Sequence, residues 1–484
     1  MRAHLARRGT RRTVTIVALA AVTLSVAAVG AIATVHPKPK PYNARAITVT
    51  SGAPDAASAE GVADGTGSTT APGWTAASSA GPVTVRRVPR VSGPFTAKTA
   101  MELSRTAVGP GSGSGWAFAL VPMRDPQKFF TAGKVYRMEA WVRDTRASSA
   151  SIGMLLANGN YGHRPADAAV YGKYNDAGWH LITRTFVASA AGWSDTAVYL
   201  GLPATGAFTF EVTGVSVKEY AAALPAKTDT LPEKVVSFTG KAGTAPSASQ
   251  WNYETGGNGW GNDELQTYTT STDNASLTGT GKLAVTARRQ TVRGADGITR
   301  DYTSARLTTE GKVVVEAGSY VEAEITAPVG AGVWPAFWTV GVNTRTQGWP
   351  AAGELDILEG WGATPTLAHS AMHMAKAGAP KTDLPYGWGE AGGTTDIRES
   401  LDARPHRYGV YFDRNVVRFY IDRKPTMTVW AADAISSGRT WPFGSDQFLV
   451  LNVAVSNGTN PVTAPFPKTM TVGEITIHEG GTPF

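Results

Sequence analysis

The sequence predicts an all-β protein with two β-sandwich (jelly-roll) domains joined by linkers, the C-terminal one carrying a concave groove. Three observations support this class. Short apolar or alternating segments recur between Gly, Pro, Asn and Asp residues, which is typical of strands and turns. Neither of the two blocks of such segments shows a long helical period. Glycine and proline number 54 and 29 among 484 residues and only 17% of residues are charged, which suits a turn-rich sheet protein.

The N-terminus predicts a targeting segment over residues 1–35. Five arginines precede the uncharged stretch Thr13–Val35, and Ala31–Ala33 offers a small-x-small cleavage site. We therefore expect a cleaved signal peptide and a secreted, extracellular protein. The uncharged stretch is also long enough to span a bilayer, so a signal anchor, with the other domains outside the cytoplasm, is the alternative.

Charge and cysteine content argue against two classes of function. The five arginines within residues 1–12 carry most of the formal net charge of +7, and without them it is +2. The basic balance is therefore a feature of the leader, and we expect no nucleic-acid partner. The chain has no cysteine, which excludes disulfides, thiol chemistry and cysteine metal sites.

Two segments predict linkers. Residues 36–73 are mainly Pro, Ala, Gly, Ser and Thr, so they cannot bury a core, and we expect a disordered linker there. Residues 221–234 form a second, shorter linker. These breaks leave two folded blocks, residues 74–220 and residues 235–484.

The first block predicts a sandwich of at least six strands. The segments that alternate between turn residues are Ala117–Val121, Val135–Val142, Ser151–Leu156, His180–Val187, Thr196–Leu202 and Phe208–Val217. Three stretches, Tyr136–Val142, Trp179–Phe186 and Phe210–Lys218, resemble the jelly-roll carbohydrate-binding modules found beside bacterial glycanases. The resemblance implies a sugar-binding surface, and a structural spacer without a ligand is the alternative.

Aromatic side chains are the candidate sugar platforms of this block. They are Trp116, Tyr161, Tyr171, Tyr174 and Trp193, although each fits a core or rim position equally well. Trp141 and Trp179 lie inside strand patterns, so we expect them in the core.

The second block also reads as strands and turns, which predicts a large sandwich of two antiparallel sheets. Its expected strands are Val313–Val315, Tyr320–Thr326, Tyr408–Phe412, Val416–Ile421, Phe448–Val455 and Met470–His478. The inner face of one sheet can then form a long groove.

An acidic motif, Gly353–Gly360, stands out in this block. In a strand Glu354 and Asp356 share one face, whereas Glu359 needs a β-bulge to join them. Like charges gathered on one face are costly, and two carboxyls held about 5–5.5 Å apart are the machinery of a retaining glycosidase. The alternative is an acidic, solvated edge strand, which the apolar neighbours of these residues disfavour.

Ten segments in order make the second block resemble glycoside hydrolase family 16, the β-jelly-roll retaining endoglycanases. They are Trp251–Tyr253, Gly259–Gln266, Lys282–Arg288, Tyr302–Arg306, Trp334–Trp338, Trp349–Gly353, the acidic motif, His369–His373, Trp441–Phe443 and Leu451–Val455. The E-x-D-x-x-E spacing and the Gly-Trp-Gly-Asn-x-Glu-Leu-Gln segment look most like the laminarinase branch. The resemblance implies endo-hydrolysis of β-1,3-glucan. A β-galactan or other β-glycan hydrolase, a transglycosylase, and a non-catalytic glucan-binding protein are the alternatives.

The resemblance also implies roles for the carboxylates. Glu354 resembles the nucleophile, Glu359 resembles the general acid/base, and Asp356 between them would tune the nucleophile. We expect the pKa of Glu359 to be raised, because the acid must start protonated.

Six further residues are candidate substrate contacts or neighbours of the site. Trp334 and Trp338 fall on one strand face and suit stacking on sugar rings, with buried core tryptophans as the alternative. Asn262 and Arg306 resemble contacts to sugar hydroxyls, and Arg306 could equally be a solvated sheet residue. Trp361 would line the far side of the scissile bond. His373 would adjoin the carboxylates, either as a catalytic or as a structural histidine.

No cofactor is expected. A structural calcium is doubtful because Gly473 stands where the family pattern has an Asp ligand. The expected partner is a polysaccharide, and a tethered-module plan predicts a monomer. Contact with a membrane is expected only if the leader is uncleaved.

Overall fold

The structure is a computed structural model that describes residues 61–484 with gaps. By contacts, the chain divides into residues 1–44 and residues 45–484, and every described residue lies in the second unit. The predicted leader lies outside the described residues. So do Trp116, Tyr161 and Trp193, and the side chain of Tyr171. The gaps are residues 64–68, 72–73, 79–82, 90, 96–98, 107–116, 124–125, 149, 158–168, 191–196, 204–205, 221–223, 228–231, 233, 388–392 and 456–461.

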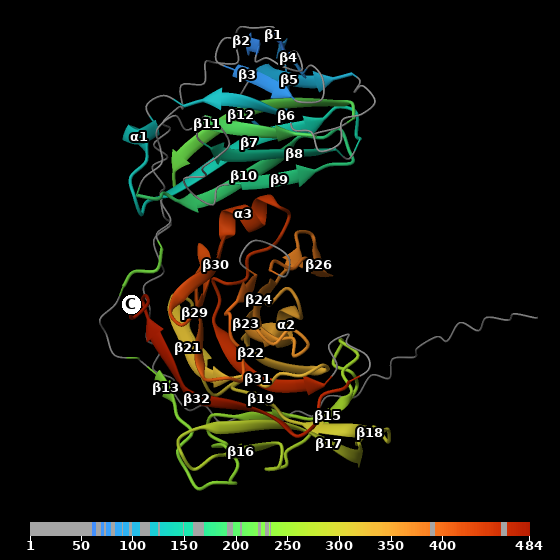
Figure 1. Ribbon diagram of the computed structural model, residues 1–484, viewed down its shortest axis with the longest axis vertical. Helices are drawn as coiled ribbons and strands as arrows, with labels where there is room; N and C mark the ends of the chain where they lie inside the picture. Colours follow the sequence, from blue (N-terminus) through green and yellow to red (C-terminus); the bar gives the residue numbers. More distant parts are fainter. Residues whose placement is uncertain are drawn as a thin grey trace, which may run out of the picture. The chain divides into compact units, whose positions relative to one another are not determined.

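The N-terminal block is a sandwich of two six-stranded antiparallel sheets (Figure 1). The first sheet has the order β1 (Gly61–Ala63), β4 (Val83–Pro89), β5 (Thr99–Arg105), β12 (Phe208–Glu219), β7 (Val135–Asp144) and β10 (His180–Val187). The second has the order β2 (Thr69–Ala71), β3 (Trp74–Ser78), β6 (Ala117–Pro122), β11 (Ala197–Leu202), β8 (Ser151–Ala157) and β9 (Ala169–Lys173). A short helix, α1 (Pro126–Phe129), follows β6.

All six strands predicted for this block are present, each within two residues of its expected ends. The prediction that residues 36–73 form only a linker is wrong at its C-terminal end, where β1 and β2 pair with β4 and β3. Short edge strands pair through backbone groups alone, so the small-residue composition that argues against a core does not argue against such strands.

The core of this sandwich follows strand alternation. On β7, Met138, Ala140 and Val142 are fully buried, whereas Trp141 is half-exposed and points to the opposite face. The prediction that Trp141 and Trp179 belong to the core is therefore wrong. Both lie around the ring of Phe95, with ring centroids 5.8 and 4.8 Å away. Strand membership alone does not decide which face a residue occupies, because that depends on register.

The C-terminal block is a second sandwich, made of a ten-stranded and an eight-stranded sheet (Figure 1). The larger sheet has the order β15 (Gln266–Tyr268), β18 (Thr299–Ser304), β17 (Leu283–Arg293), β32 (Lys468–Glu479), β21 (Ser319–Thr326), β28 (His406–Phe412), β29 (Val416–Ile421) and β30 (Lys424–Trp430), with β13 (Lys234–Val236) beside β32 and β16 (Ala275–Leu277) beside β17. The smaller has the order β14 (Asn252–Glu254), β19 (Arg306–Thr308), β31 (Gln447–Val455), β22 (Val333–Gly341), β23 (Glu354–Gly360), β24 (Leu367–His373) and β27 (Thr394–Asp396), with β20 (Val314–Val315) beside β31.

A separate two-stranded hairpin, β25 (Ala375–Lys376) and β26 (Ala379–Asp383), follows β24. Two short helices, α2 (Thr344–Gln347) and α3 (Ala431–Ser436), complete the block. The all-β prediction is therefore confirmed. Among the described residues, no helix is long and apolar enough to cross a membrane.

Pro335 does not mark an edge, although a proline disfavours a fully paired strand. Its strand, β22, lies between β31 and β23. The pairing of β22 with β23 begins one residue later, at Ala336 opposite Glu359, so the missing N–H of the proline falls outside that ladder.

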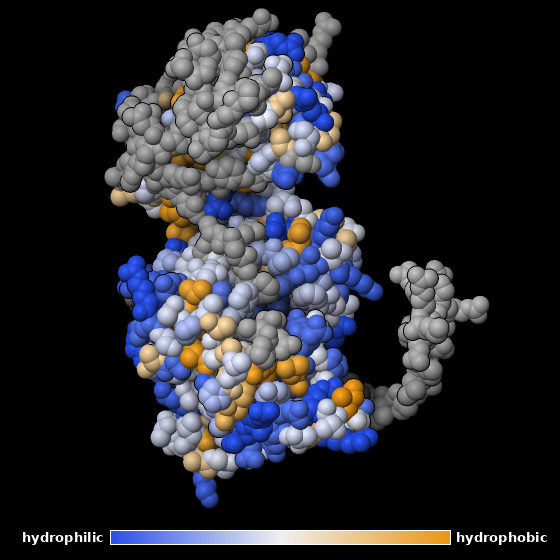
Figure 2. Space-filling view, turned by 45° about the vertical axis from the view of Figure 1, so that its right-hand side comes forward, coloured by the Kyte–Doolittle hydropathy of each residue, from blue (hydrophilic) through white to orange (hydrophobic). Residues whose placement is uncertain are grey.

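The apolar core of the block lies between its two sheets. It is built from buried residues of both sheets, such as Phe337, Leu355, Val410, Leu451 and Ile475. The visible face in Figure 2 is mostly hydrophilic, with hydrophobic residues in separate patches. The smaller sheet buries one face in this core, which leaves its other face to form a groove.

Candidate active site

A β-bulge brings the three carboxylates of β23 onto one face. Against β22, Leu358 and Glu359 pair with Phe337 and Ala336, whereas Asp356 pairs with Trp338, so Ile357 is the extra residue. The pairing with β24 shifts at the same place. The predicted bulge is confirmed. Because side chains alternate along a strand, the inserted residue is what returns Glu359 to the face of Glu354 and Asp356.

All three carboxylates line a groove of about 620 Å³. Its walls come from six strands that are adjacent in the sheet: β14, β19, β31, β22, β23 and β24. With strands about 4.8 Å apart, the groove crosses roughly 24 Å of sheet. This width is enough for several linked rings rather than a single small molecule.

Glu354 is the half-buried carboxylate of the three. It accepts a hydrogen bond from Nε1 of Trp349 at 3.1 Å. Burial raises the pKa of Glu354, and the charges of His373 and Arg306 together with the Trp349 bond oppose that rise. The surroundings of Glu354 therefore contain the cations that a carboxylate nucleophile needs to remain ionised.

Asp356 is more deeply buried, with 5% of its surface exposed. Burial raises the pKa of Asp356 well above its usual value, and the charges of Glu354, Glu359 and Asp383 raise it further. Like charges at close range cannot all ionise, so Asp356 takes up a proton more readily than an exposed aspartate.

Glu359 is also buried, with 4% of its surface exposed. Nε1 of Trp334 donates a hydrogen bond to its Oε1 at 2.9 Å. Trp334 therefore orients this carboxyl as well as lining the groove. The raised pKa expected for Glu359 stays a prediction.

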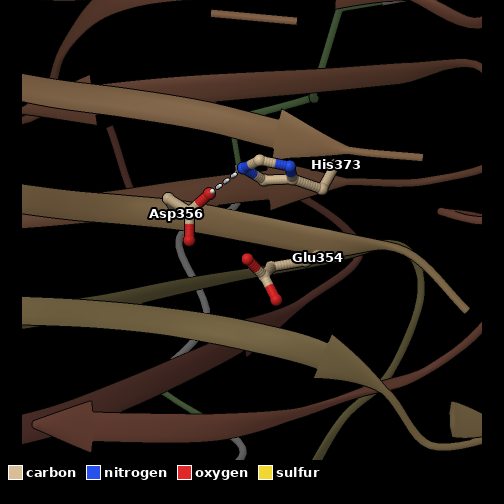
Figure 3. Close-up of side chains that lie close together, drawn as sticks. All are labelled: Glu354, Asp356 and His373. Carbon is tan, nitrogen blue, oxygen red and sulfur yellow. Dashed lines mark ion pairs between the residues drawn. The ribbon is translucent and has the colours of Figure 1, made fainter. Parts of the chain in front are cut away.

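His373 projects from β24 toward the same carboxylates. Its Nε2 lies 3.5 Å from Oδ2 of Asp356, and its Nδ1 lies 2.7 Å from Oδ2 of Asp383. Figure 3 shows the ring above Asp356, with Glu354 close to both. Donor atoms of Glu354, Asp356 and His373 lie within 4.8 Å of one another, so these residues could hold a metal ion. The acid–base chemistry of the same groups requires none.

Aromatic rings enclose the guanidinium of Arg306. Its Cζ lies 4.6 Å from the ring centroids of both Trp260 and Trp338, and its Nε donates to Glu254. Two cation–π contacts hold the side chain at one place in the groove. The alternative of a solvated sheet residue is therefore wrong for Arg306, because its partners bury most of it.

Trp338 is held by a buried chain of hydrogen bonds. Its Nε1 donates to Oδ1 of Asn452 at 2.7 Å, and Nδ2 of Asn452 donates to the hydroxyl of Tyr268 at 3.1 Å. The Tyr268 hydroxyl in turn donates to Glu264 at 2.9 Å. Trp338 is 8% exposed, so it offers the groove only part of its ring. Its position is intermediate between the two alternatives, a platform for sugar rings and a buried core tryptophan.

The two remaining predicted contacts, Asn262 and Trp361, differ in whether they line the groove. Asn262 lines the groove from an exposed loop. Trp361 is not among the lining residues; its ring stacks on His369 with centroids 4.3 Å apart. The stacking partner lies on β24 and pairs across the sheet with Glu359, so Trp361 contacts a neighbour of that carboxyl without lining the groove itself.

Among the lining residues that sequence reasoning did not name as contacts are Trp260, Glu254, Trp349 and Asp383. Trp260 and Trp349 belong to segments that carry the family resemblance, and a systematic search of those segments for aromatics would have found them. Nothing in the sequence points to Asp383, because only the path of the hairpin brings it to His373.

The doubt about calcium rests on Gly473, which offers no side-chain ligand. A Cβ at Gly473 would lie 3.3 Å from Cβ of Glu324 and 3.4 Å from its carbonyl oxygen, so β21 packs closely against this position. Among the described residues, the only group of three carboxylate or imidazole side chains close enough for a metal is the one in the groove.

The chain is similar to known glycoside hydrolases. Residues 266–384 match the family described as "XgeA-like, catalytic GH16 domain". A β-glucanase of Rhodothermus marinus is 30% identical over 247 residues, which cover 48% of this chain and 80% of that protein. A glucan endo-1,3-β-glucosidase of Cryptopygus antarcticus is 33% identical over 216 residues, 43% of this chain and 75% of that protein. The laminarinase catalytic domain of Thermotoga maritima is 29% identical, with a TM-score of 0.46, over 52% of this chain and 99% of that one.

Proposed function

This chain belongs to glycoside hydrolase family 16 and is a glycoside hydrolase, and we propose that it is a retaining endo-glycosidase that cleaves β-1,3-glucan by double displacement. The observation that carries the proposal is the bulge at Ile357, which places Glu354 and Glu359 on one face of β23 inside a long groove. Paired carboxyls of this kind, one as nucleophile and one as acid, perform retaining glycoside hydrolysis.

In the first step, a carboxylate oxygen of Glu354 attacks the anomeric carbon. The bond from that carbon to the glycosidic oxygen breaks, and Glu359 gives its proton to the leaving oxygen. The products are a glycosyl ester on Glu354 and the shortened sugar chain. The hydrogen bonds from Trp349 to Glu354 and from Trp334 to Glu359 hold both carboxyls in place.

In the second step, Glu359 acts as a base. It takes a proton from a water molecule, the water oxygen bonds to the anomeric carbon, and the ester bond to Glu354 breaks. Two displacements at one carbon retain its configuration. Burial and the neighbouring carboxylates raise the pKa of Asp356, and in its protonated form it can donate a hydrogen bond to Glu354 and stabilise it as a leaving group.

The substrate class is supported by the relatives and by the groove. One relative is a glucan endo-1,3-β-glucosidase and another is a β-glucanase. The width of the groove fits several rings of a polysaccharide, which favours cleavage within the chain. Trp334 and Trp338 supply aromatic surface for sugar faces.

The test is sugar release by the purified full-length chain from laminarin, mixed-linkage β-glucan, agarose and β-1,3-galactan. We expect oligosaccharides from laminarin and none from Glu354→Gln. A matched control is Glu324→Gln, because Glu324 is a carboxylate on the other sheet, paired with Lys282. NMR of the fresh products should show the β anomer first.

Other outcomes separate the alternatives. Release only from a galactan would keep the chemistry and change the substrate. Products longer than the starting oligosaccharides would identify a transglycosylase. Glucan binding without any release would contradict the proposal and favour a glucan-recognition protein.

The leader and the N-terminal sandwich extend the proposal. A cleaved leader over residues 1–35 would make the enzyme extracellular, where polysaccharides are found. The N-terminal sandwich would hold the substrate, and Tyr174 is the described candidate platform: its ring stacks on His180 with centroids 3.9 Å apart. The test compares two full-length variants, Glu354→Gln and Glu354→Gln with Tyr174→Ala. The difference in their affinity for laminarin measures the contribution of Tyr174 to binding.

A further inference from the structure

Asp383 lies behind the active-site histidine, on an element outside the sheet that carries the carboxylates. The hairpin β25–β26 begins two residues after His373 and ends at Asp383. There, Oδ2 of Asp383 lies 2.7 Å from Nδ1 of His373. The opposite ring nitrogen faces Oδ2 of Asp356 at 3.5 Å. One imidazole thus joins the hairpin to the cluster on β23.

We propose that Asp383 is a positioning residue, which holds the His373 ring with Nε2 toward Asp356 and Glu354. This inference rests on the proposed function, because it concerns a histidine that faces the nucleophile of that reaction. The orientation follows from the short bond: a carboxylate at Nδ1 requires an N–H there, which fixes how the ring presents its other nitrogen.

The backbone next to Asp383 is held from two sides. The N–H of Leu384 donates to the carbonyl of Met374 at 2.9 Å. Arg439 donates to the carbonyl of Leu384 at 3.1 Å and to that of Pro385 at 2.9 Å. Asp383 itself pairs in register with Ala375 across the hairpin. These bonds leave the carboxylate little freedom to leave His373.

The groups around His373 are mainly carboxyls. Glu354, Asp356 and Glu359 face it from β23 and Asp383 faces it from β26, while the ring of Trp349 lies 5.7 Å away. Burial lowers the pKa of His373, but the Asp383 bond and the surrounding charges outweigh burial and raise it above its usual value. The imidazolium therefore persists to higher pH than in a free histidine.

A charged His373 changes what Glu354 can do. Burial raises the pKa of Glu354, and the charge of His373 is the largest influence that opposes the rise. Attack on the anomeric carbon requires the ionised form of Glu354. The charge of Asp383 itself raises the pKa of Glu354, but by less than the charge of His373 lowers it. Asp383 therefore favours the ionised nucleophile only through His373.

The experiment compares Asp383→Asn, Asp383→Glu and a matched control, Asp396→Asn, in the full-length chain. Asp396 lies on β27, an edge strand of the same sheet, and its carboxylate accepts from the backbone N–H of Arg398. Asp383→Asn keeps an oxygen acceptor and removes only the charge. Asp383→Glu restores the charge on a longer side chain.

Two readouts separate positioning from a merely structural role. The first is the pKa of His373, from its imidazole NMR signals, assigned by comparison with His373→Gln. It should fall in Asp383→Asn, return toward the wild-type value in Asp383→Glu and stay unchanged in Asp396→Asn. The second is the pH profile of kcat, measured with KM.

In Asp383→Asn we expect kcat to fall by at least about tenfold, with KM within about threefold. The profile should narrow from its basic side, because the imidazolium loses its proton at lower pH. Its acidic limb should not move to higher pH, because His373 is protonated there in both proteins and the charge of Asp383 itself raises the pKa of Glu354. Asp383→Glu should recover most of kcat.

A wild-type pKa of His373 in Asp383→Asn, or an unshifted profile, would overturn the inference. An equal loss in Asp383→Asn and Asp383→Glu, with a lowered Tm in both, would also overturn it in favour of a structural role. The NMR titration needs no substrate, so it still decides the inference if the chain cleaves a glycan other than β-1,3-glucan.

Discussion

Two buried carboxylates in the C-terminal sandwich, Glu322 and Asp356, have opposite surroundings. Glu322 lies on the ten-stranded sheet with 1% of its surface exposed, and Asp356 lies on the eight-stranded sheet with 5% exposed. Glu322 accepts bonds from Arg423 at 2.6 Å, from Tyr320 at 2.9 Å and from Arg407 at 3.2 Å. The neighbours of Asp356 are mainly other carboxylates.

The difference is visible in their ionisation. Burial raises the pKa of Glu322, but the bonds from Arg423 and Tyr320 outweigh it, so the pKa ends below its usual value. For Asp356, burial and the nearby charges act in the same direction and raise the pKa. Burial alone therefore does not identify a functional carboxylate. A buried acid that lies among other carboxyls and lines a groove indicates chemistry.

The largest expected effect tests the roles within the acidic cluster. Glu354→Ala and Glu359→Ala should each lower hydrolysis of glucan by at least about 10³-fold. Added azide should restore turnover in both, with opposite stereochemistry. With Glu359→Ala, azide replaces water on the glycosyl ester and gives the β-azide; with Glu354→Ala, it attacks directly and gives the α-azide.

Product NMR decides that assignment. A β-azide from Glu354→Ala would reverse the two roles. Because these substitutions remove like charges from one site, neither should lower the Tm, in contrast with the next change.

Glu322→Gln should act on stability and leave catalysis intact. It breaks the bonds to two guanidinium groups, which are partly exposed and can turn to water, so we expect a loss of about 1–3 kcal/mol. Thermal unfolding should show it as a drop of about 2–4 °C per kcal/mol. The matched control Glu324→Gln, on the same strand but half-exposed, should change the free energy of unfolding by less than about 1 kcal/mol. A wild-type Tm together with lost activity in Glu322→Gln would contradict this prediction, because Glu322 would then serve catalysis and not stability.

The two acids should also differ in pH dependence. The pKa of Glu322 is lowered on folding, so its stabilisation is present above its unfolded pKa and is lost as the pH falls through its folded pKa. The difference in Tm between the wild type and Glu322→Gln should therefore shrink on acidification. Scanning calorimetry at a series of pH values below neutral measures this, and a difference that grows in acid would contradict it.

Asp356→Asn should do the reverse. A carboxyl whose pKa is raised on folding destabilises the fold at pH above its unfolded pKa, because the folded state holds the proton more tightly. Removing the titrating group should raise the Tm at neutral pH, by about 2–4 °C for each kcal/mol relieved, while kcat falls. An unchanged Tm near neutral pH, together with full activity, would remove Asp356 from the cluster's chemistry.

The smallest expected effect concerns one hydrogen bond. Trp334→Phe keeps a ring for sugar stacking and removes the Nε1 donor to Glu359. A bond to a charged or polar group of this kind is worth about 1–3 kcal/mol, so kcat should fall by about 5- to 100-fold with KM little changed. Trp251→Phe is the control, because that ring stacks on Phe238 in the apolar core and this change should leave kcat within about twofold.

Much of the fold was predictable because strand patterns are local. The alternation of apolar residues along β10 and β29 predicts those strands to the residue. The spacing of Glu354, Asp356 and Glu359 required a bulge, and the bulge is present at Ile357. These features depend on neighbours in the chain, so the sequence contains them directly.

The face of the sheet on which a side chain lies, and the residues that it contacts, were not predictable in the same way. The outward face of Trp141, the central place of Pro335 and the enclosed position of Arg306 depend on register and on which strand lies beside which. The edge strands β1 and β2 form through backbone pairing that composition does not reveal.

The sequence by itself determined the all-β class, the two blocks and the carboxylates that identify the glycosidase, because alternation and motif spacing are properties of consecutive residues. Only the tertiary structure decided which charges those carboxylates meet. Asp383 reaches His373 through the turn of a hairpin, and Arg306 reaches Glu254 across paired strands. Electrostatic interactions depend on distance in space, and that distance follows from the fold, not from separation along the chain.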